Sequence, residues 1–564
     1  MRNLLSALLL FSILYSCNTG KVQEVSFSNP ILPGFYPDPS ICRVENDYYL
    51  VNSTFSFFPG IPIFHSTDLV NWNQIGNVLD RPEQLNLEGL GISQGIYAPA
   101  IRYHKGTFYL VCTVVGGIGN FVVTAKNPAG PWSVPVALPH VQGMDPDIFF
   151  DTDGKAYLTS CWPAPDNKPL YDGHRSIRTL EFFPETLTTG TEEKLLANGG
   201  ADISKEPIWI EGPHIYKVDD YYYLMAAEGG TSTGHSEVIF RAKAVTGPYE
   251  VYEKNPILTQ RNLDPARENP ITCTGHADLV ETPEGEWFSV FLGCRPYENG
   301  FFNTGRETFM TPVTWKDGWP VINPDSTAIQ YSYSIPSTGE TTVNGFPLNK
   351  NFVLRDSFNT PDLAPYWLFI RTPFKQKHSI DKQNGGLVLA LSPEMLNQFT
   401  NPAFIGRRQQ HLHAEAAVSM VFKANSAQEL AGISAFQNDA NYYLLAKTLV
   451  DNKEAVVLYK SVKSETGISP EILAVKFPES HERIYLKIKA DKGSYSFYFA
   501  TTEGNWLPVA ENVDGKYLST EVAGGFVGTI LGMHASATGT DSGNTATFEW
   551  FEYSGNDPTF LPEK

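Results

Sequence analysis

The sequence predicts an all-β protein, in which a five-bladed β-propeller over residues 26–335 is followed by a β-sandwich over residues 350–564. Glycine and proline are frequent, with 46 and 40 residues, and they interrupt the chain at short intervals, as expected for many short strands joined by turns. Long amphipathic helical stretches are scarce, and 564 residues exceed the size of one ordinary domain. An internal repeat then specifies the propeller.

The first residues predict a signal peptide rather than a part of the fold. Arg2 precedes an apolar run from Leu4 to Tyr15, which is too short for a membrane span of roughly 20 residues. The run ends in Leu-Tyr-Ser-Cys, which resembles the lipobox of bacterial lipoproteins and would make Cys17 the lipidated first residue of the mature chain. We therefore expect a lipoprotein signal peptide at 1–16 and a tether at 17–25. The protein is expected to be exported to the periplasm or cell surface of a bacterium and to touch the membrane only through a lipid at Cys17; simple secretion is the alternative.

The internal repeat consists of a strand, a tight turn and a second strand that contains an aromatic residue. Five segments share it: 39–51, 99–111, 146–159, 213–225 and 277–290. One apolar residue anchors each copy, namely Ile41, Ile101, Ile148, Ile215 and Leu279. The anchors are 60, 47, 67 and 64 residues apart, which is enough for one four-stranded sheet each. Repeats of this size in an all-β chain indicate propeller blades that bury their faces against their neighbours.

The register of the repeat brings acidic residues to one axis. In a propeller the first strand of each blade lies nearest the central axis, so residues at the start of these strands converge on the mouth of the central channel. Three positions before the anchors stand Asp38, Ala98, Asp145, Gly212 and His276, and Glu211 directly precedes Gly212. Three carboxylates that are far apart in sequence are therefore expected to meet at one site.

Each of these residues also has a structural interpretation. Asp before Pro commonly starts a turn, and four such pairs occur, at Asp38, Asp145, Asp264 and Asp557. Only the first two fall in the register of the repeat, so we interpret those two as catalytic and the others as turn residues. Glu211 taken alone fits equally well as an exposed acid at a strand end, and His276 fits a buried histidine bonded to the backbone.

The second domain begins after a polar passage from Ser334 to Asn349 that is rich in Ser, Thr and Gly. From there on, several short segments alternate apolar and polar residues, among them 387–392, 416–422, 442–448, 484–490, 494–500 and 545–553. Such segments predict a β-sandwich. The sequence leaves open whether this domain is a structural partner of the propeller or binds carbohydrate itself.

Composition excludes several classes of partner. The net charge of −19 would repel phosphate backbones and anionic lipid surfaces, so nucleic acid is not expected. Beyond Cys17 five cysteines remain, without C-x-x-C spacing, which argues against a disulfide scaffold and a zinc site. We expect no metal in the active site and no required cofactor. A structural calcium is compatible with the chain, although no D-x-D-x-D-G loop occurs.

Several motifs occur in order along the chain: Pro-Gly-Phe-Tyr-Pro-Asp38-Pro-Ser, Tyr97-Ala-Pro, Met-Asp145-Pro-Asp-Ile, Glu211-Gly-Pro-His and Gly-Arg306-Glu-Thr. Together they resemble the motifs of glycoside hydrolase family 43, especially its two-domain β-xylosidases and α-L-arabinofuranosidases, over about residues 26 to 560. The resemblance implies a five-bladed propeller that acts with inversion. It also implies that the second domain is concanavalin-like, packs against the blades and narrows the pocket.

The resemblance implies a role for each matching residue. Asp38 matches the general base and Glu211 the general acid, which must hold its proton near neutral pH. Asp145 matches a third carboxylate that orients the acid and raises its pKa, and Arg306 a sugar-binding residue expected to pair with Asp145 and keep it ionised. The further substrate contacts implied are aromatic walls at Phe55 and Tyr97 and a histidine at the channel floor, His276. Asp147 departs from the family, which often has Ser there; its alternation puts it on the same strand face as Asp145.

The resulting hypothesis is an inverting exo-glycosidase that releases a terminal pentose from xylan- or arabinan-derived oligosaccharides, with β-xylosidase as the main interpretation and α-L-arabinofuranosidase as the alternative. A retaining enzyme of the β-fructofuranosidase kind would carry Asn-Asp-Pro-Asn and Glu-Cys patterns that the sequence lacks. A non-catalytic glycan-binding lipoprotein is a further alternative. The sugar, the linkage and the oligomeric state stay open at this stage.

Overall fold

The computed structural model describes residues 24–336, 345–383, 385–465, 467–479 and 481–560. It confirms the all-β architecture. Within these residues the only α-helix is α1 (Thr520–Ala523), and the 3-10 turns are η1 (Pro82–Gln84), η2 (Pro165–Asn167), η3 (Ile203–Lys205), η4 (Gly515–Leu518) and η5 (Pro558–Phe560). None of the described helices is long and apolar enough to cross a membrane. The predicted signal peptide and Cys17 lie outside the described residues.

The first domain contains five antiparallel sheets, and each is formed by strands from one stretch of the chain. The first comprises β2 (Ser40–Val44), β3 (Asp47–Val51), β5 (Gly60–Ser66) and β6 (Asn73–Leu79). The second comprises β7 (Gly95–Ile96), β8 (Ala100–His104), β9 (Thr107–Val115), β10 (Gly119–Ala125) and β11 (Val136–Ala137). The third comprises β12 (Met144–Phe150), β13 (Ala156–Pro163), β14 (Arg175–Phe183), β15 (Thr188–Thr189) and β16 (Lys194–Asn198).

The fourth sheet comprises β17 (Glu211–Val218), β18 (Tyr221–Glu228), β19 (Ser236–Ala242), β20 (Glu250–Val251) and β21 (Leu258–Thr259). The fifth comprises β22 (Thr272–Glu281), β23 (Trp287–Cys294), β24 (Glu307–Lys316) and β25 (Trp319–Ile322). Strand β1 (Glu24–Ser28) pairs with β26 (Ser332–Pro336), so the two ends of the domain are joined.

The first strands of the sheets surround one axis. Strands β2, β8, β12, β17 and β22 contact one another in that order, and β22 contacts β2 to close the ring. A buried ionic network links all five: Arg102 of β8 donates to Asp147 of β12 at 2.7 Å and to Asp278 of β22 at 2.9 Å. Ser40 of β2 donates to Asp278 at 2.8 Å, and Nδ1 of His214 of β17 lies 2.9 Å from Asp147.

The second domain is a sandwich of two antiparallel sheets. One contains β27 (Phe352–Asp356), β29 (His378–Ile380), β30 (Leu387–Ala390), β32 (His413–Val421), β37 (Arg483–Asp491), β38 (Ser494–Ala500), β39 (Leu507–Asp514) and β41 (Thr545–Gly555). The other contains β31 (Phe404–Arg408), β33 (Leu430–Asn438), β34 (Asn441–Val450), β35 (Lys453–Ser464), β36 (Gly467–Lys476) and β40 (Ile530–Ser536). Alternate residues of both sheets form a common core.

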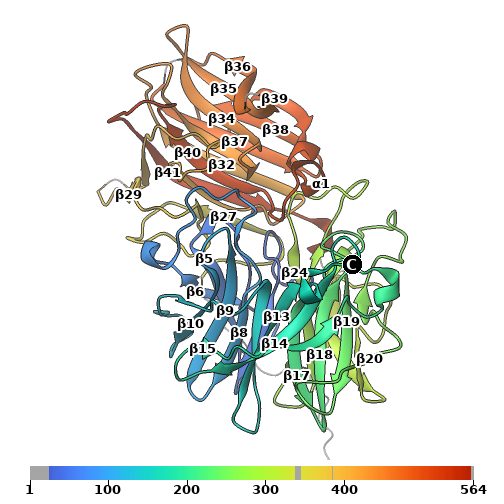
Figure 1. Cartoon of the computed structure of the whole chain (residues 1–564). Coiled ribbons are helices and arrows are strands. Elements are labelled where there is room, and N and C mark those ends of the chain that lie inside the picture. Colours follow the sequence, from blue (N-terminus) through green and yellow to red (C-terminus); the bar gives the residue numbers. More distant parts are fainter. Residues whose placement is uncertain (1–23, 337–344, 384, 466, 480, 561–564) are drawn as a thin grey trace, which may run out of the picture.

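The six-stranded sheet packs its other face against the propeller. Figure 1 shows the two domains lying against each other. Phe57 of the propeller and Tyr442 of the sandwich belong to one hydrophobic cluster, and β28 (Phe369–Ile370) pairs with β4 (Phe57–Phe58). The buried guanidinium of Arg295 binds Glu307 of the propeller at 2.7 Å and Asp557 of the sandwich at 2.8 Å. Asp557 lies two residues beyond β41, so the eight-stranded sheet also reaches the propeller at one end.

Candidate active site

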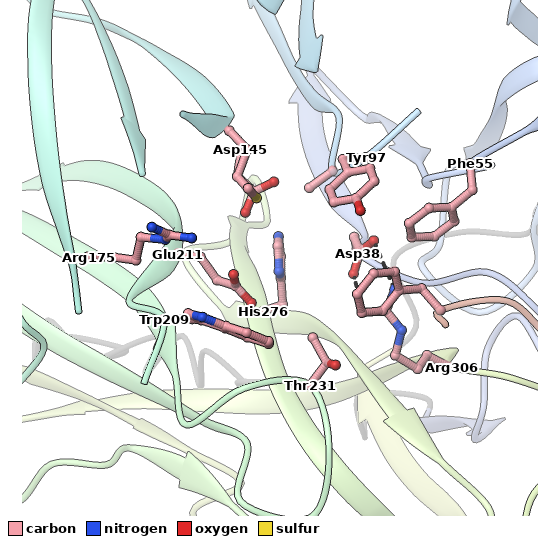
Figure 2. A pocket seen from close by; sticks show the side chains of 13 residues that line it. Asp38, Phe55, Tyr97, Asp145, Arg175, Trp209, Glu211, Thr231, His276 and Arg306 are labelled. Carbon is pink, nitrogen blue, oxygen red and sulfur yellow. Dashed lines mark hydrogen bonds and ion pairs between the residues drawn. The ribbon is translucent and has the colours of Figure 1, made fainter. Parts of the chain in front are cut away.

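A cavity of about 700 Å³ opens at one end of the ring of inner strands (Figure 2). It is lined by Asp38, Phe55, Tyr97, Ala98, Met144, Asp145, Arg175, Trp209, Glu211, Thr231, His276, Arg306 and Phe526. All seven candidate catalytic and substrate-binding residues named from the sequence line this cavity. The lipidation candidate Cys17 lies outside the described residues.

Backbone irregularities at the start of the inner strands aim the acidic side chains into the cavity. Asp38, Asp145, Gly212 and His276, which occupy equivalent positions in the repeat, all have left-handed φ angles between +51° and +55°. The pairing register shifts between Met144 and Asp147, between Glu211 and His214, and between Gly275 and Asp278. A bulge of this kind bends a strand and re-aims its side chains, and left-handed backbone in residues other than glycine is costly, so it is typical of functional sites.

Glycine at position 212 explains why the acid of this sheet stands one residue earlier than in its neighbours. A Cβ atom on Gly212 would lie 2.7 Å from Nε2 of His276, closer than real Cβ contacts allow. The position can therefore carry no side chain, and the carboxylate comes from Glu211. Burial lowers the pKa of His276 to about 4, so the imidazole that packs against Gly212 is neutral at ordinary pH.

Asp38 is held by two donors. Nη1 of Arg306 donates to Oδ1 of Asp38 at 2.9 Å, and the hydroxyl of Ser53 donates to Oδ2. Both members of the ion pair are buried, with side chains 7% and 6% exposed. The expected pairing of Arg306 with Asp145 is therefore wrong, because the guanidinium extends from the fifth sheet to the neighbouring first sheet, which carries Asp38.

Glu211 and Asp145 lie in an environment that favours their protonated forms. Burial, followed by the negative charges of Asp145 and Asp38, raises the pKa of Glu211 well above its usual range. Burial and Asp38 also raise the pKa of Asp145, to about 7, although the backbone N–H of Gly212 donates to it. A carboxyl with a raised pKa and an ion-paired carboxylate thus share one cavity, which is the arrangement that paired acid and base chemistry requires.

Aromatic rings close one side of the cavity. Phe55 stacks on Phe526 with ring centroids 5.6 Å apart, and Tyr97 meets both rings at 5.1 and 5.9 Å. Phe526 belongs to the sandwich, in the segment between α1 and β40, and its backbone N–H donates to the hydroxyl of Ser93 at 3.0 Å. The Arg306 guanidinium lies 5.5 Å from the Phe526 ring centroid. The second domain therefore supplies part of the cavity wall.

Sequence reasoning missed five lining residues, namely Met144, Arg175, Trp209, Thr231 and Phe526. Trp209 is 37% exposed although it is a large aromatic residue, and it lies beside Glu211 in Figure 2. Because Trp209 stands only two positions before the proposed acid Glu211, the sequence could have identified it as a residue of the site. Phe526, in Gly-Gly-Phe-Val-Gly, offered none, since nothing local connects it to the propeller.

Asp147 does not share the site with Asp145. The bulge between Met144 and Asp147 breaks the alternation on which that expectation rested, and Asp147 turns into the ionic network around Arg102. Among the described residues, no group of three or more His, Cys, Asp or Glu side chains is arranged to hold a metal ion.

Comparisons with known proteins agree on one family. The model of Glycosyl hydrolases family 43 matches residues 27–320, and the model of the Beta xylosidase C-terminal Concanavalin A-like domain matches residues 355–554. A Bacteroides ovatus protein named non-reducing end alpha-L-arabinofuranosidase is 39% identical over 98% of this chain and 99% of its own length. A Bacillus subtilis beta-xylosidase is 32% identical over 94% of this chain and 99% of its own length.

Solved structures give the same result. A GH43_12 protein retrieved from a capybara gut metagenome superposes with a TM-score of 0.84 at 42% identity, covering 92% of this chain and 96% of that one. Xylan beta-1,4-xylosidase from Bacillus halodurans also gives a TM-score of 0.84, at 31% identity, covering 94% of this chain and all of that one.

Proposed function

The chain belongs to glycosyl hydrolases family 43, and from this premise we propose that it removes a terminal pentose from the non-reducing end of plant-derived oligosaccharides with inversion at the anomeric carbon. The observation that carries the proposal is the meeting of Asp38, Asp145 and Glu211, from three different blades, in one cavity. The surroundings of the carboxyls differ as an acid and a base require: Asp38 is paired with Arg306, whereas burial raises the pKa of Glu211.

The proposed reaction is a single displacement. Asp38, oriented by Arg306, accepts a proton from a water molecule, whose oxygen attacks the anomeric carbon. Glu211 donates its proton to the glycosidic oxygen as the bond to the leaving group breaks. Its raised pKa supports this role, because an acid must still hold its proton when substrate binds. Asp145 is a positioning residue whose charge contributes to that raised pKa.

The cavity is closed on one side, and this supports hydrolysis at the ends of a sugar chain rather than within it. Phe55, Tyr97 and Phe526 form a continuous aromatic wall, so a sugar ring that enters is enclosed on that side rather than passed through a groove. Trp209, on the opposite side next to Glu211, offers a partly exposed indole face toward the leaving group.

We propose β-xylosidase as the main activity. α-L-Arabinofuranosidase is the second candidate, because the 39% identical Bacteroides ovatus relative bears that name, while a 38% identical Butyrivibrio fibrisolvens relative is named xylosidase/arabinosidase. Comparing kcat/KM for an aryl β-D-xyloside and an aryl α-L-arabinofuranoside decides between them. Proton NMR of the first-formed anomer tests inversion, and a product that retains the configuration of the substrate would refute it.

Two variants test the roles of the carboxyls separately. Glu211→Gln removes the acid, so it should lose far more activity on a xylobiose-type substrate than on a 2,4-dinitrophenyl glycoside, whose leaving group needs no proton. Asp38→Asn removes the base and should impair both substrates alike. Equal losses on both substrates for Glu211→Gln would exclude it as the acid.

We further propose that the chain is exported and lipidated at Cys17. The basis is the sequence pattern of residues 1–17. Labelling of cells with a radioactive fatty acid should mark the protein, and Cys17→Ser should abolish the label. Label that persists in Cys17→Ser would refute the assignment.

A further inference from the structure

The outer face of the eight-stranded sheet carries a trough that the reaction does not use. Core residues of the sandwich alternate with outward residues along β32, β37 and β41, so the outward residues point away from the six-stranded sheet. The outward residues Arg355, Glu552, Ala417 and Lys487 form one row across β27, β41, β32 and β37. Ala417 is small and stands between long side chains, so the row is hollow at its centre.

Two connected hollows form the trough. One, of about 540 Å³, is lined by the row and by Trp506, Trp550, Glu415, Glu503, Gly504 and Ser554. The next, of about 720 Å³, runs along the same strands from His413 to Lys489 and shares Glu415 and Ser554 with the first. The trough is therefore longer than a site for one small molecule.

Two tryptophans line the trough, and a cation covers one face of each ring. Arg355 lies 4.0 Å from the Trp550 ring centroid, and Lys487 lies 4.8 Å from that of Trp506. Each cation fixes an indole ring in place. Within the described residues neither indole N–H donates a hydrogen bond to the protein, and both side chains are half-buried, so both donors remain free for a ligand.

The polar groups of the trough match hydroxyl groups better than a charged ligand. Arg355 is bound by Glu552 at 2.7 Å and Glu503 at 3.1 Å, and Lys487 by Glu415 at 3.3 Å. The cations are thus already neutralised, and three carboxylates face two cations, which disfavours an anionic ligand. Ion-paired carboxylates and guanidinium groups still have lone pairs and N–H groups for sugar hydroxyls.

We propose that this trough binds a neutral polysaccharide chain, with the faces of Trp506 and Trp550 that the cations leave uncovered as platforms for its sugar rings and the row of charged residues as hydrogen-bonding partners. The trough lies on the outer face of the eight-stranded sheet and shares no lining residue with the cavity. It would hold the polymer while the cavity acts on chain ends, and it does not depend on which pentose the cavity accepts.

Affinity electrophoresis in native gels that contain soluble neutral arabinoxylan or xyloglucan tests the proposal. All proteins carry Glu211→Gln to stop turnover, and free xylose and arabinose at saturating concentration occupy the cavity. The parent protein should be retarded by a neutral polymer and not by polygalacturonate. Trp506→Ala, and separately Ala417→Trp, which fills the trough, should each weaken the apparent affinity at least tenfold. Ile472→Ala, an exposed apolar residue on β36 of the other sheet, should bind as the parent does.

The same substitutions in the active enzyme should leave kcat/KM on an aryl glycoside unchanged, which shows that the fold and the cavity are intact. Thermal unfolding of each variant checks the fold directly. The proposal is overturned if neither neutral polymer retards the parent, if free pentose abolishes the retardation, or if both Trp506→Ala and Ala417→Trp bind as the parent does.

Discussion

Replacement of Gly212 by alanine tests how the inner strands set the geometry of the site. Gly212 has a φ of +55°, and its added Cβ would meet Nε2, Cε1 and Cδ2 of His276 at 2.7, 2.8 and 3.0 Å. The imidazole would have to retreat by roughly 0.7 Å to restore an ordinary contact, and misplacement of about 1 Å in an active site can cost about 100-fold in rate. Because Glu211 directly precedes Gly212, we expect a 10- to 100-fold loss of kcat/KM on an aryl pentoside.

A matched control separates this contact from backbone strain. Gly154 has a φ of +91° and open space around its would-be Cβ, so Gly154→Ala brings the strain of a left-handed alanine, about 1–2 kcal/mol, without a clash. Both variants should lose stability in urea unfolding, but only Gly212→Ala should lose activity. If Gly212→Ala retained full activity, or if Gly154→Ala lost as much, the contact with His276 would not govern the site.

Three further perturbations test other parts of the structure. Phe526→Ala removes a stacked ring from the cavity wall and should lower kcat/KM by roughly 10- to 100-fold, about 1.4–2.8 kcal/mol, with little change in melting temperature; an unchanged kcat/KM would mean that the sandwich contributes nothing to binding. Asp145→Asn removes a negative charge that helps to raise the pKa of Glu211, so the alkaline limb of the kcat profile should move to lower pH; a shift to higher pH would contradict the electrostatic argument. Arg102→Leu leaves two buried carboxylates without their cation and should cost about 3–5 kcal/mol in denaturant unfolding, whereas Lys155→Leu, which breaks an exposed ion pair with Glu181, should cost at most about 1 kcal/mol; equal losses would count against the network.

The sequence predicts the repeat and the position of the carboxyls because both depend on local patterns. Each anchor residue, such as Ile148, lies in the strand of its sheet that faces the axis, since alternation within a strand is fixed by the pleat. The same alternation gave a wrong prediction for Asp147, because the pleat is interrupted there. The bulge after Met144 separates Asp147 from Asp145, and a bulge leaves no signature in residue type at this position.

Contacts between distant segments are the part that could not be predicted. Arg306 was expected to bind Asp145 but binds Asp38, a choice between two acids that depends on how neighbouring sheets are rotated about the axis. Phe526 contacts Phe55 although 471 positions separate their numbers, and the surfaces that bring them together follow from the docking of two domains rather than from periodicity in either.

The position of Phe526 has a consequence for heat inactivation. One side of the cavity exists only while the sandwich is folded and docked, so a sub-global opening of that domain would dismantle the wall while every acid stayed in its blade. Turnover would then serve as a reporter for the integrity of a domain that carries none of the proposed acids. Selection for activity at high temperature would therefore act on residues of the interface between the two domains as strongly as on residues of the blades.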